Sequence, residues 1–246
     1  MPVDLYDSTF SSPCTLVRML ARHIGAELNL REVNFTKNEH LSPEFFKINP
    51  FHKVPTLCDD GFVIYESTAI CLYLLNKYAP DSELYPKDLQ KRARVDQILG
   101  TVTSFVQPRY AEFYATSLRL MKKPTAEQIQ ALEEGALKGM ETLIGDGQFA
   151  AGDQLTLADL SLVAHLSFTI KLPVFDSSRF SKLVSYYGRV SAQLPYFAET
   201  NEKYIDLVRD ANKHSGIETA SFVLNIYIYI YIYIYIYIYY IYIYMT

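Results

Sequence analysis

Two hydroxyl groups, a proline and a thiol stand side by side in Ser11-Ser12-Pro13-Cys14. Ser12 is a favourable N-cap and Pro13 suits the first helical position, so the sequence predicts that a helix begins here. The free N–H groups at the start of a helix favour an anion. Compared with a Cys-x-x-Cys redox motif, Ser11 replaces the first cysteine. Dithiol chemistry is therefore lost, but the hydroxyl can still donate a hydrogen bond to an external thiolate.

Two further segments offer polar groups at the start of a predicted element. A cis bond at Val54-Pro55 would turn the N–H and C=O of Val54 toward an extended peptide ligand, although the sequence leaves the isomer open. Ser67 is predicted to cap the next helix and to hold a carboxylate with its neighbouring N–H groups, while Glu66 can accept from an ammonium group. The three segments are expected to meet at one end of a sheet, where they suit a small zwitterionic peptide with a thiol.

The elements that position these segments alternate between strands and helices. Apolar runs predict strands over 3–6, 28–35, 55–58 and 62–65, and helical spacing predicts helices over 12–24 and 67–78 with a short helical turn over 42–50. Gly25 is expected to end the first helix, and Asp60-Gly61 to form a hairpin turn. The order β-α-β-α-β-β-α predicts a small α/β domain whose last two strands are antiparallel.

The second half of the chain shows helical spacing only. We expect a first domain over 1–80, a linker over 81–87, an all-helical domain over 88–215 and a tail over 216–246. The candidate helices cover residues 88–119, 125–144, 157–170, 178–193 and 197–212. Thr156 is predicted to cap the third of them, with Asp159 bonding back to the cap and Leu155 packing on Leu160. We interpret this motif as a folding signal rather than as a catalytic acid.

Composition and charge exclude several classes of protein. The 246 residues hold 23 Lys and Arg against 27 Asp and Glu, without the basic patch that a nucleic-acid partner needs. Cys14, Cys58 and Cys71 are too few and too unpatterned for a disulfide framework or a four-cysteine zinc site, so no metal is expected and a reducing cytoplasm fits. Asp4 and Asp7 stand where a signal peptide would be apolar.

The tail is an Ile-Tyr repeat that starts at Ile226 and runs with one interruption to Tyr244. Three interpretations compete. Alternation of β-branched and aromatic residues favours an added strand. The length approaches that of a membrane anchor, although ten phenols make a poor span. The favoured interpretation is an in-frame translation of an alternating A-T nucleotide repeat, so the tail is left out of the functional argument. A membrane partner is not expected unless this tail is genuine.

Several segments together resemble the cytosolic glutathione transferases, and most closely the serine-type delta and epsilon classes of arthropods. The resemblance extends over about residues 3–212. The segments that carry it are the first strand, Ser11-Ser12-Pro13-Cys14, the stretch from Asn49 to Leu57, the stretch from Glu66 to Ile70, the stretch from Phe149 to Asp159, and Leu194-Pro195-Tyr196-Phe197.

The resemblance implies a thioredoxin-like domain joined to a helical domain, usually in a homodimer, with glutathione as co-substrate and no other cofactor. Ser11 would donate to the glutathione sulfur, with Ser12 as an alternative donor. Glutathione would lie against the residues His40, His52, Val54, Pro55, Glu66, Ser67 and Thr68. Thr68 departs from the usual Arg or His, and Phe51 from a common Gln. Either change could weaken glutathione binding or alter the dimer contact.

An aromatic set in the first long helix is the candidate wall of an apolar pocket for the second substrate, a small hydrophobic electrophile. Its members are Phe105, Tyr110, Phe113 and Tyr114, with Arg109 nearby. Ordinary core or dimer packing explains the same spacing equally well. The function expected from the resemblance is conjugation of glutathione to hydrophobic electrophiles, that is, detoxification. The alternatives are a non-catalytic binding protein of the same fold and a glutathione-dependent thiol-disulfide enzyme, against which the missing cysteine at position 11 argues.

Overall fold

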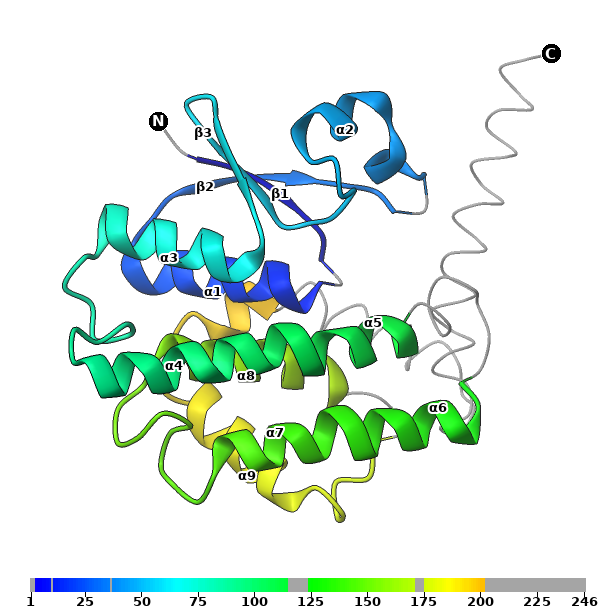
Figure 1. Cartoon of the computed structure of the whole chain (residues 1–246), viewed down its shortest axis with the longest axis vertical. Helices are drawn as coiled ribbons and strands as arrows, with labels where there is room; N and C mark the ends of the chain where they lie inside the picture. The colour runs from blue at the N-terminus through cyan, green and yellow to red at the C-terminus, as the bar shows by residue number, and fades with distance from the viewer. Residues whose placement is uncertain (1–2, 10, 36, 115–123, 171–174, 202–246) are drawn as a thin grey trace.

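A computed structural model describes residues 3–9, 11–35, 37–114, 124–170 and 175–201. The Ile-Tyr tail and the predicted helix beyond residue 201 lie outside this described part. A four-stranded sheet lies at one end of the molecule, and helices α1 and α3 lie between the sheet and the helices of the second half of the chain (Figure 1). No helix among the described residues is long and apolar enough to span a membrane.

The first domain follows the predicted order of elements. Its elements are β1 (Val3–Asp7), α1 (Ser12–Ile24), β2 (Leu28–Glu32), the 3-10 turn η1 (Glu39–Leu41), α2 (Pro43–Ile48), β3 (Thr56–Asp59), β4 (Phe62–Tyr65) and α3 (Ser67–Tyr78). The strands lie in the order β2-β1-β3-β4, with β1 and β2 parallel and the other pairs antiparallel. The predicted fold class is therefore confirmed. The second strand ends at Glu32, three residues earlier than predicted.

Two predicted helix caps are wrong by one residue. Ser11, not Ser12, is the N-cap of α1: its backbone is extended and its Oγ accepts from the N–H of Cys14 at 3.3 Å. Ser12 is already the first helical residue. At α3 the cap position belongs to Glu66, whose φ is 71° and whose side chain makes no cap bond, so Ser67 is inside the helix. The predicted stop of α1 is confirmed, because Gly25 takes the left-handed conformation, with φ 70°, that glycine adopts without strain.

The helical half breaks each of the two long predicted helices into pieces. The elements are α4 (Leu89–Thr101), the π-helical stretch η2 (Val102–Val106), α5 (Gln107–Tyr114), α6 (Ala126–Ala131), the π-helical stretch η4 (Leu132–Leu137), α7 (Lys138–Ile144), α8 (Leu157–Thr169) and α9 (Ser181–Ser191). The two π-helical stretches face each other. A Cβ at Gly135 would lie 2.2 Å from Cδ of Arg109, so the glycine permits this close approach.

Helix α8 is the centre of the helical half, since every one of its side chains is buried. Its predicted cap is confirmed: the N–H and hydroxyl of Thr156 donate to Oδ2 of Asp159 at 2.8 and 2.9 Å. The other carboxylate oxygen of Asp159 accepts from the N–H of Ala150 and from the hydroxyl of Tyr186, at 2.8 and 2.7 Å. Helix α8 packs on α1, so it supports the helix that carries Ser11 (Figure 1).

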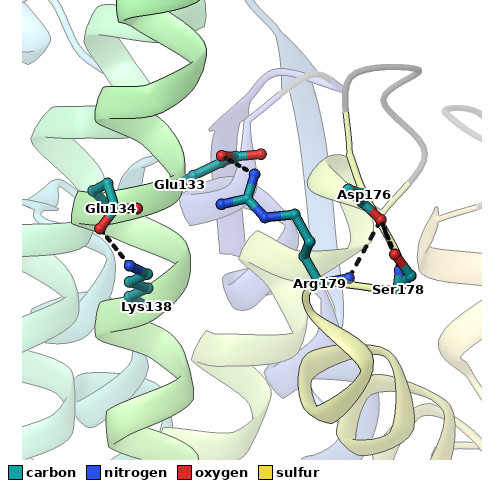
Figure 2. A network of polar contacts seen from close by, with 6 residues as sticks. All are labelled: Glu133, Glu134, Lys138, Asp176, Ser178 and Arg179. Carbon is teal, nitrogen blue, oxygen red and sulfur yellow. Dashed lines mark hydrogen bonds and ion pairs between the residues drawn. The ribbon is translucent and has the colours of Figure 1, made fainter.

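A polar network joins η4 to the start of α9 (Figure 2). Arg179 donates to the nearly buried carboxylate of Glu133 at 2.6 Å. Asp176 accepts from the backbone N–H of both Ser178 and Arg179, which holds the segment before α9 in place.

Candidate functional site

The sheet register brings the predicted site residues to one edge. Tyr6 of β1 lies opposite Thr56 of β3, and Thr56 lies opposite Tyr65 of β4. The carboxyl ends of β1 and β4 and the amino end of β3 therefore share an edge. Ser11 follows β1, Val54-Pro55 precedes β3, and Glu66-Ser67 follows β4, so all three segments start from this edge.

Ser11 is half-buried at the start of α1. Its Oγ accepts from the N–H of Cys14, and a hydroxyl that accepts a hydrogen bond can also donate one. Ser12, the alternative donor, is 8% exposed. The thiol of Cys14 is buried, and burial raises its pKa well above the usual range, with Asp7 raising it further and Ser11 and Arg18 lowering it. Cys14 therefore stays protonated and is not a nucleophile.

The two candidate histidines are joined to each other. Nδ1 of His52 donates to the backbone carbonyl of His40 at 2.7 Å. This bond fixes the orientation of the ring and leaves Nε2 as its second polar atom. His52 has a left-handed backbone, with φ 56°, and its ring lies 5.4 Å from that of Phe46. His40 is buried, and its ring stacks on Phe35 at 4.4 Å. Of the two, His52 is the more accessible to a ligand at this edge.

The segment before β3 is held by a buried amide. Nδ2 of Asn49, which is fully buried, donates to the carbonyl of Lys53 and to Oγ1 of Thr56, both at 2.9 Å. The Val54-Pro55 bond is cis, which settles the isomer that the sequence left open. Within the described part of the chain, the N–H and C=O of Val54 have no hydrogen-bond partner. They are therefore available to an extended ligand.

The start of α3 is the third part of the site. Ser67 is 7% exposed, Thr68 is half-buried and Glu66 is exposed. The first N–H groups of α3 have no partner inside the helix, so they can bind a carboxylate. The exposed carboxylate of Glu66 stands beside them, where it can accept from an ammonium group. One end of this helix thus offers partners for both charges of an amino-acid head group.

Comparison with known proteins assigns the family. Residues 1–76 match the family model "Glutathione S-transferase, N-terminal domain". A delta-class glutathione transferase of Nilaparvata lugens is 38% identical, with a TM-score of 0.73 over 82% of this chain and 94% of that one. This chain belongs to the glutathione transferase family. The sequence-based assignment is thereby confirmed.

Two other solved structures are also similar to this family member. Glutathione Transferase E6 from Drosophila melanogaster is 32% identical, with a TM-score of 0.75 over 82% of this chain and 91% of that one. A glutathione transferase homologue from Drosophila mojavensis, solved with bound glutathione, is 31% identical, with a TM-score of 0.76 over 92% of this chain and 96% of that one. The similar structures include both delta-class and epsilon-class enzymes of insects.

The structure separates the aromatic set that was predicted to line a pocket in this transferase. Tyr110 and Phe113 are core side chains, 4% and 3% exposed. Phe105 is 39% exposed, and the guanidinium of Arg109 lies 3.6 Å from the centre of its ring. The side chain of Tyr114 lies outside the described part. Among the side chains of this set that the structure describes, Phe105 is thus exposed and Arg109 half-buried at the predicted position, and the pocket itself stays a prediction.

A charged pair that was not predicted from the sequence lies next to the turn that leads to Ser11. Asp7 and Arg18 form an ion pair with side chains that are 7% and 12% exposed. The available signal was an arginine among the apolar positions of α1, on the same face as Cys14. No group of three or more His, Cys, Asp or Glu among the described residues is arranged to hold a metal ion.

Proposed function

We propose that this protein conjugates the glutathione thiolate to hydrophobic electrophiles at the edge of the sheet that carries Ser11. The observation that carries the proposal is the register, which brings Ser11, Val54 and Glu66-Ser67 to one edge. The three segments match the three parts of glutathione. The Ser11 hydroxyl faces the sulfur, the Val54 backbone pairs with the cysteinyl residue, and Glu66-Ser67, with Thr68 beside them, bind the γ-glutamyl end. His40 and His52 are assigned to the glycine end, next to Pro55.

The chemistry requires stabilisation of a thiolate. A free thiol with a pKa of about 8.5 is only a few per cent ionised at neutral pH. Lowering the pKa by about 2 units takes about 2.7 kcal/mol of preferential stabilisation of the anion. One hydroxyl donor contributes about 1.5–3 kcal/mol when its acceptor is charged, and the N-terminus of α1 adds about 0.5 kcal/mol. The two together are of the size required.

The second substrate and the assembly are part of the same proposal. Residues 1–80 bind glutathione, and the helical domain over 88–215 supplies an apolar site for the electrophile, with Phe105 and Arg109 at its surface. The protein acts as a cytoplasmic homodimer. Phe51, which is 61% exposed and packs edge-on against Tyr65 with ring centres 5.4 Å apart, is one contact that this dimer would cover.

The test separates the catalytic role of Ser11 from its cap. Ser11→Ala removes the hydroxyl and the cap, and we expect it to lower the free energy of unfolding by about 1 kcal/mol. Ser11→Asn keeps a cap acceptor but loses the hydroxyl, so its stability stays near that of the wild type. Both variants should lose about 20-fold in conjugation rate with an aryl halide at neutral pH, because the bound thiol returns toward its free pKa and is then only a few per cent ionised.

Retention of the full chain on glutathione-agarose is measured for each variant, with Ser12→Ala as the matched control. Both Ser11 variants should still be retained and Ser12→Ala should keep its rate. Full conjugation activity in both Ser11 variants would assign the donor elsewhere. A wild-type protein that neither binds the resin nor conjugates the aryl halide would refute the proposed function.

A further inference from the structure

The turn that carries Ser11 is tied to one buried side chain. Arg18 lies on the second turn of α1 and is 12% exposed at its side chain. Its Nη1 binds the carboxylate of Asp7, the last residue of β1, and makes a long contact of 3.4 Å with the carbonyl of Ser8. Its Nη2 donates to Oγ1 of Thr15 at 2.8 Å. The guanidinium thus connects the end of β1, the turn and the first turn of α1.

Two of the residues that Arg18 contacts, Ser8 and Thr15, are themselves hydrogen-bonded to the backbone of Ser11. The carbonyl of Ser8, which Arg18 contacts, also accepts from the N–H of Ser11 at 3.2 Å. The N–H of Thr15, whose hydroxyl Arg18 binds, donates to the carbonyl of Ser11 at 2.9 Å. Both backbone groups of Ser11 therefore bond to residues that Arg18 holds. The rigid fork of an arginine suits this task, since it donates to several acceptors in a fixed geometry.

The same pair also sets the charge next to the site. Asp7 is 5% exposed, and its carboxylate would stand unpaired near the start of α1 without Arg18. The buried thiol of Cys14, whose N–H bonds to Ser11, reports this balance: beyond the larger effect of burial, Asp7 raises its pKa and Arg18 lowers it. A negative charge of this kind opposes any second anion placed nearby.

We propose that Arg18 is a positioning residue for the conjugation reaction, which holds the backbone of Ser8 and Ser11 and neutralises Asp7 so that the Ser11 hydroxyl faces the thiolate without an opposing charge. Arg18 contacts neither substrate. Its effect passes through the turn and through the charge of Asp7. The inference rests on the proposed function for its kinetic consequences, but the hold on the turn is a property of the free protein.

Three variants separate the two effects. Arg18→Met removes the fork and leaves Asp7 unpaired, so the pKa of the bound glutathione thiol should rise by about one unit and kcat at neutral pH should fall about ten-fold. Arg18→Lys keeps the charge without the fork, so the pKa should stay close to that of the wild type while kcat falls about three-fold. Asp7→Asn combined with Arg18→Met should return the pKa toward the wild type, because neither charge remains.

The readouts are the pH dependence of kcat and of the ultraviolet absorbance of the bound thiolate. Arg22→Met is the matched control, because Arg22 lies one turn further along α1 and pairs on the surface with Glu199 at 2.7 Å. An Arg18→Met variant that folds and titrates like the wild type would overturn the proposal. So would a double variant that titrates like Arg18→Met. If Arg18→Met does not fold, Arg18→Lys and the double variant decide by the same comparison.

Hydrogen exchange of the ligand-free protein gives a test that does not depend on glutathione. Peptides covering residues 8–15 should exchange about ten-fold faster in Arg18→Lys than in the wild type. In Arg22→Met the exchange rate of the same peptides should equal that of the wild type. If the wild-type protein fails to bind glutathione but Arg18→Lys still exchanges faster, the proposed function is refuted while the hold of Arg18 on the backbone near Ser11 is supported. Unchanged exchange in Arg18→Lys would refute the positioning role, whatever the activity.

Discussion

The role of a single residue in this protein depends more on its surroundings than on its residue type. Ser11 is both a helix cap and the candidate donor to a thiolate, because its oxygen accepts from the N–H of Cys14 and a hydroxyl can also donate. His165 shows the opposite outcome. Its ring is buried in α8, with Nδ1 bound to the carbonyl of Ser161 at 2.7 Å and Nε2 without a hydrogen-bond partner among the described residues. It is a core histidine, and burial lowers its pKa to about 4.

This depressed pKa predicts a loss of stability in mild acid. The unfolded chain binds a proton at His165 below its ordinary pKa of about 6.5, whereas the folded protein does not until about pH 4. The unfolded state therefore holds more protons in this window. The contribution is fully present above pH 6.5 and falls as the pH drops toward 4.

Urea unfolding at pH 7 and pH 5 checks this prediction. The wild type should lose about 2 kcal/mol between the two values, and His165→Leu should lose clearly less. His23→Gln is the control, since burial also lowers the pKa of His23 but that ring is only partly covered. An equal pH dependence in the wild type and His165→Leu would contradict the assignment.

At the scale of elements, side chains that look equivalent in sequence contribute differently to the free energy of unfolding, because their helices pack in different places. Glu133 and Glu134 are neighbours in η4, and each pairs with a cation. Glu134 and Lys138 lie one turn apart on an exposed face, whereas Glu133 has an 11% exposed side chain and reaches across to Arg179 before α9 (Figure 2). The first pair lies within one continuous helical run, whereas the second links segments 46 residues apart in the chain.

Removing the cation from each pair should therefore have unequal effects. Arg179→Ala leaves a nearly buried carboxylate without its partner and should lower the free energy of unfolding by about 2 kcal/mol, less than for a fully buried pair because Arg179 is half-exposed. Lys138→Ala should cost no more than about 0.5 kcal/mol. Thermal denaturation of the two variants measures the difference, and equal losses would show that the contact between η4 and the start of α9 contributes nothing.

At the scale of the whole molecule, the two halves share a core. Helix α1 packs on α3 beneath the sheet and on α8 of the helical half. The N–H of Leu157 at the start of α8 donates to the carbonyl of Leu84 in the linker at 2.8 Å. The far end of α1 also contacts the helical half, through the bond between His23 and Tyr196 at 2.8 Å. The helix that carries Ser11 is therefore held from both ends by the rest of the chain.

This continuity predicts cooperative unfolding. Loss of far-ultraviolet circular dichroism and exposure of the buried tyrosines should follow one urea transition with the same midpoint, because neither half keeps its apolar faces covered alone. A first transition that removes the sheet while the helical signal stays intact would show that the two halves are independently stable.

The sequence by itself determined the order of the elements in the first domain, the end of α1 at Gly25, the hairpin at Asp60-Gly61, the cap formed by Thr156 and Asp159, and the family. These features depend on residues close together in the chain, whose local conformational preferences favour the same structure as the final packing. For the same reason, the candidates Ser11, Val54, Glu66 and Ser67 could be named from short motifs at element starts. The candidates His40, His52 and Thr68 were named only from the family resemblance.

Tertiary structure alone decided which side chains are buried and which partners they contact. The aromatic residues of α5 have the same spacing whether they line a pocket or fill a core, and packing buried Tyr110 and Phe113. The partners Asp7 and Arg18 lie in different elements, so no local pattern joins them. A charge is buried only when folding brings its counterion within reach, and that depends on how β1 and α1 are placed in three dimensions.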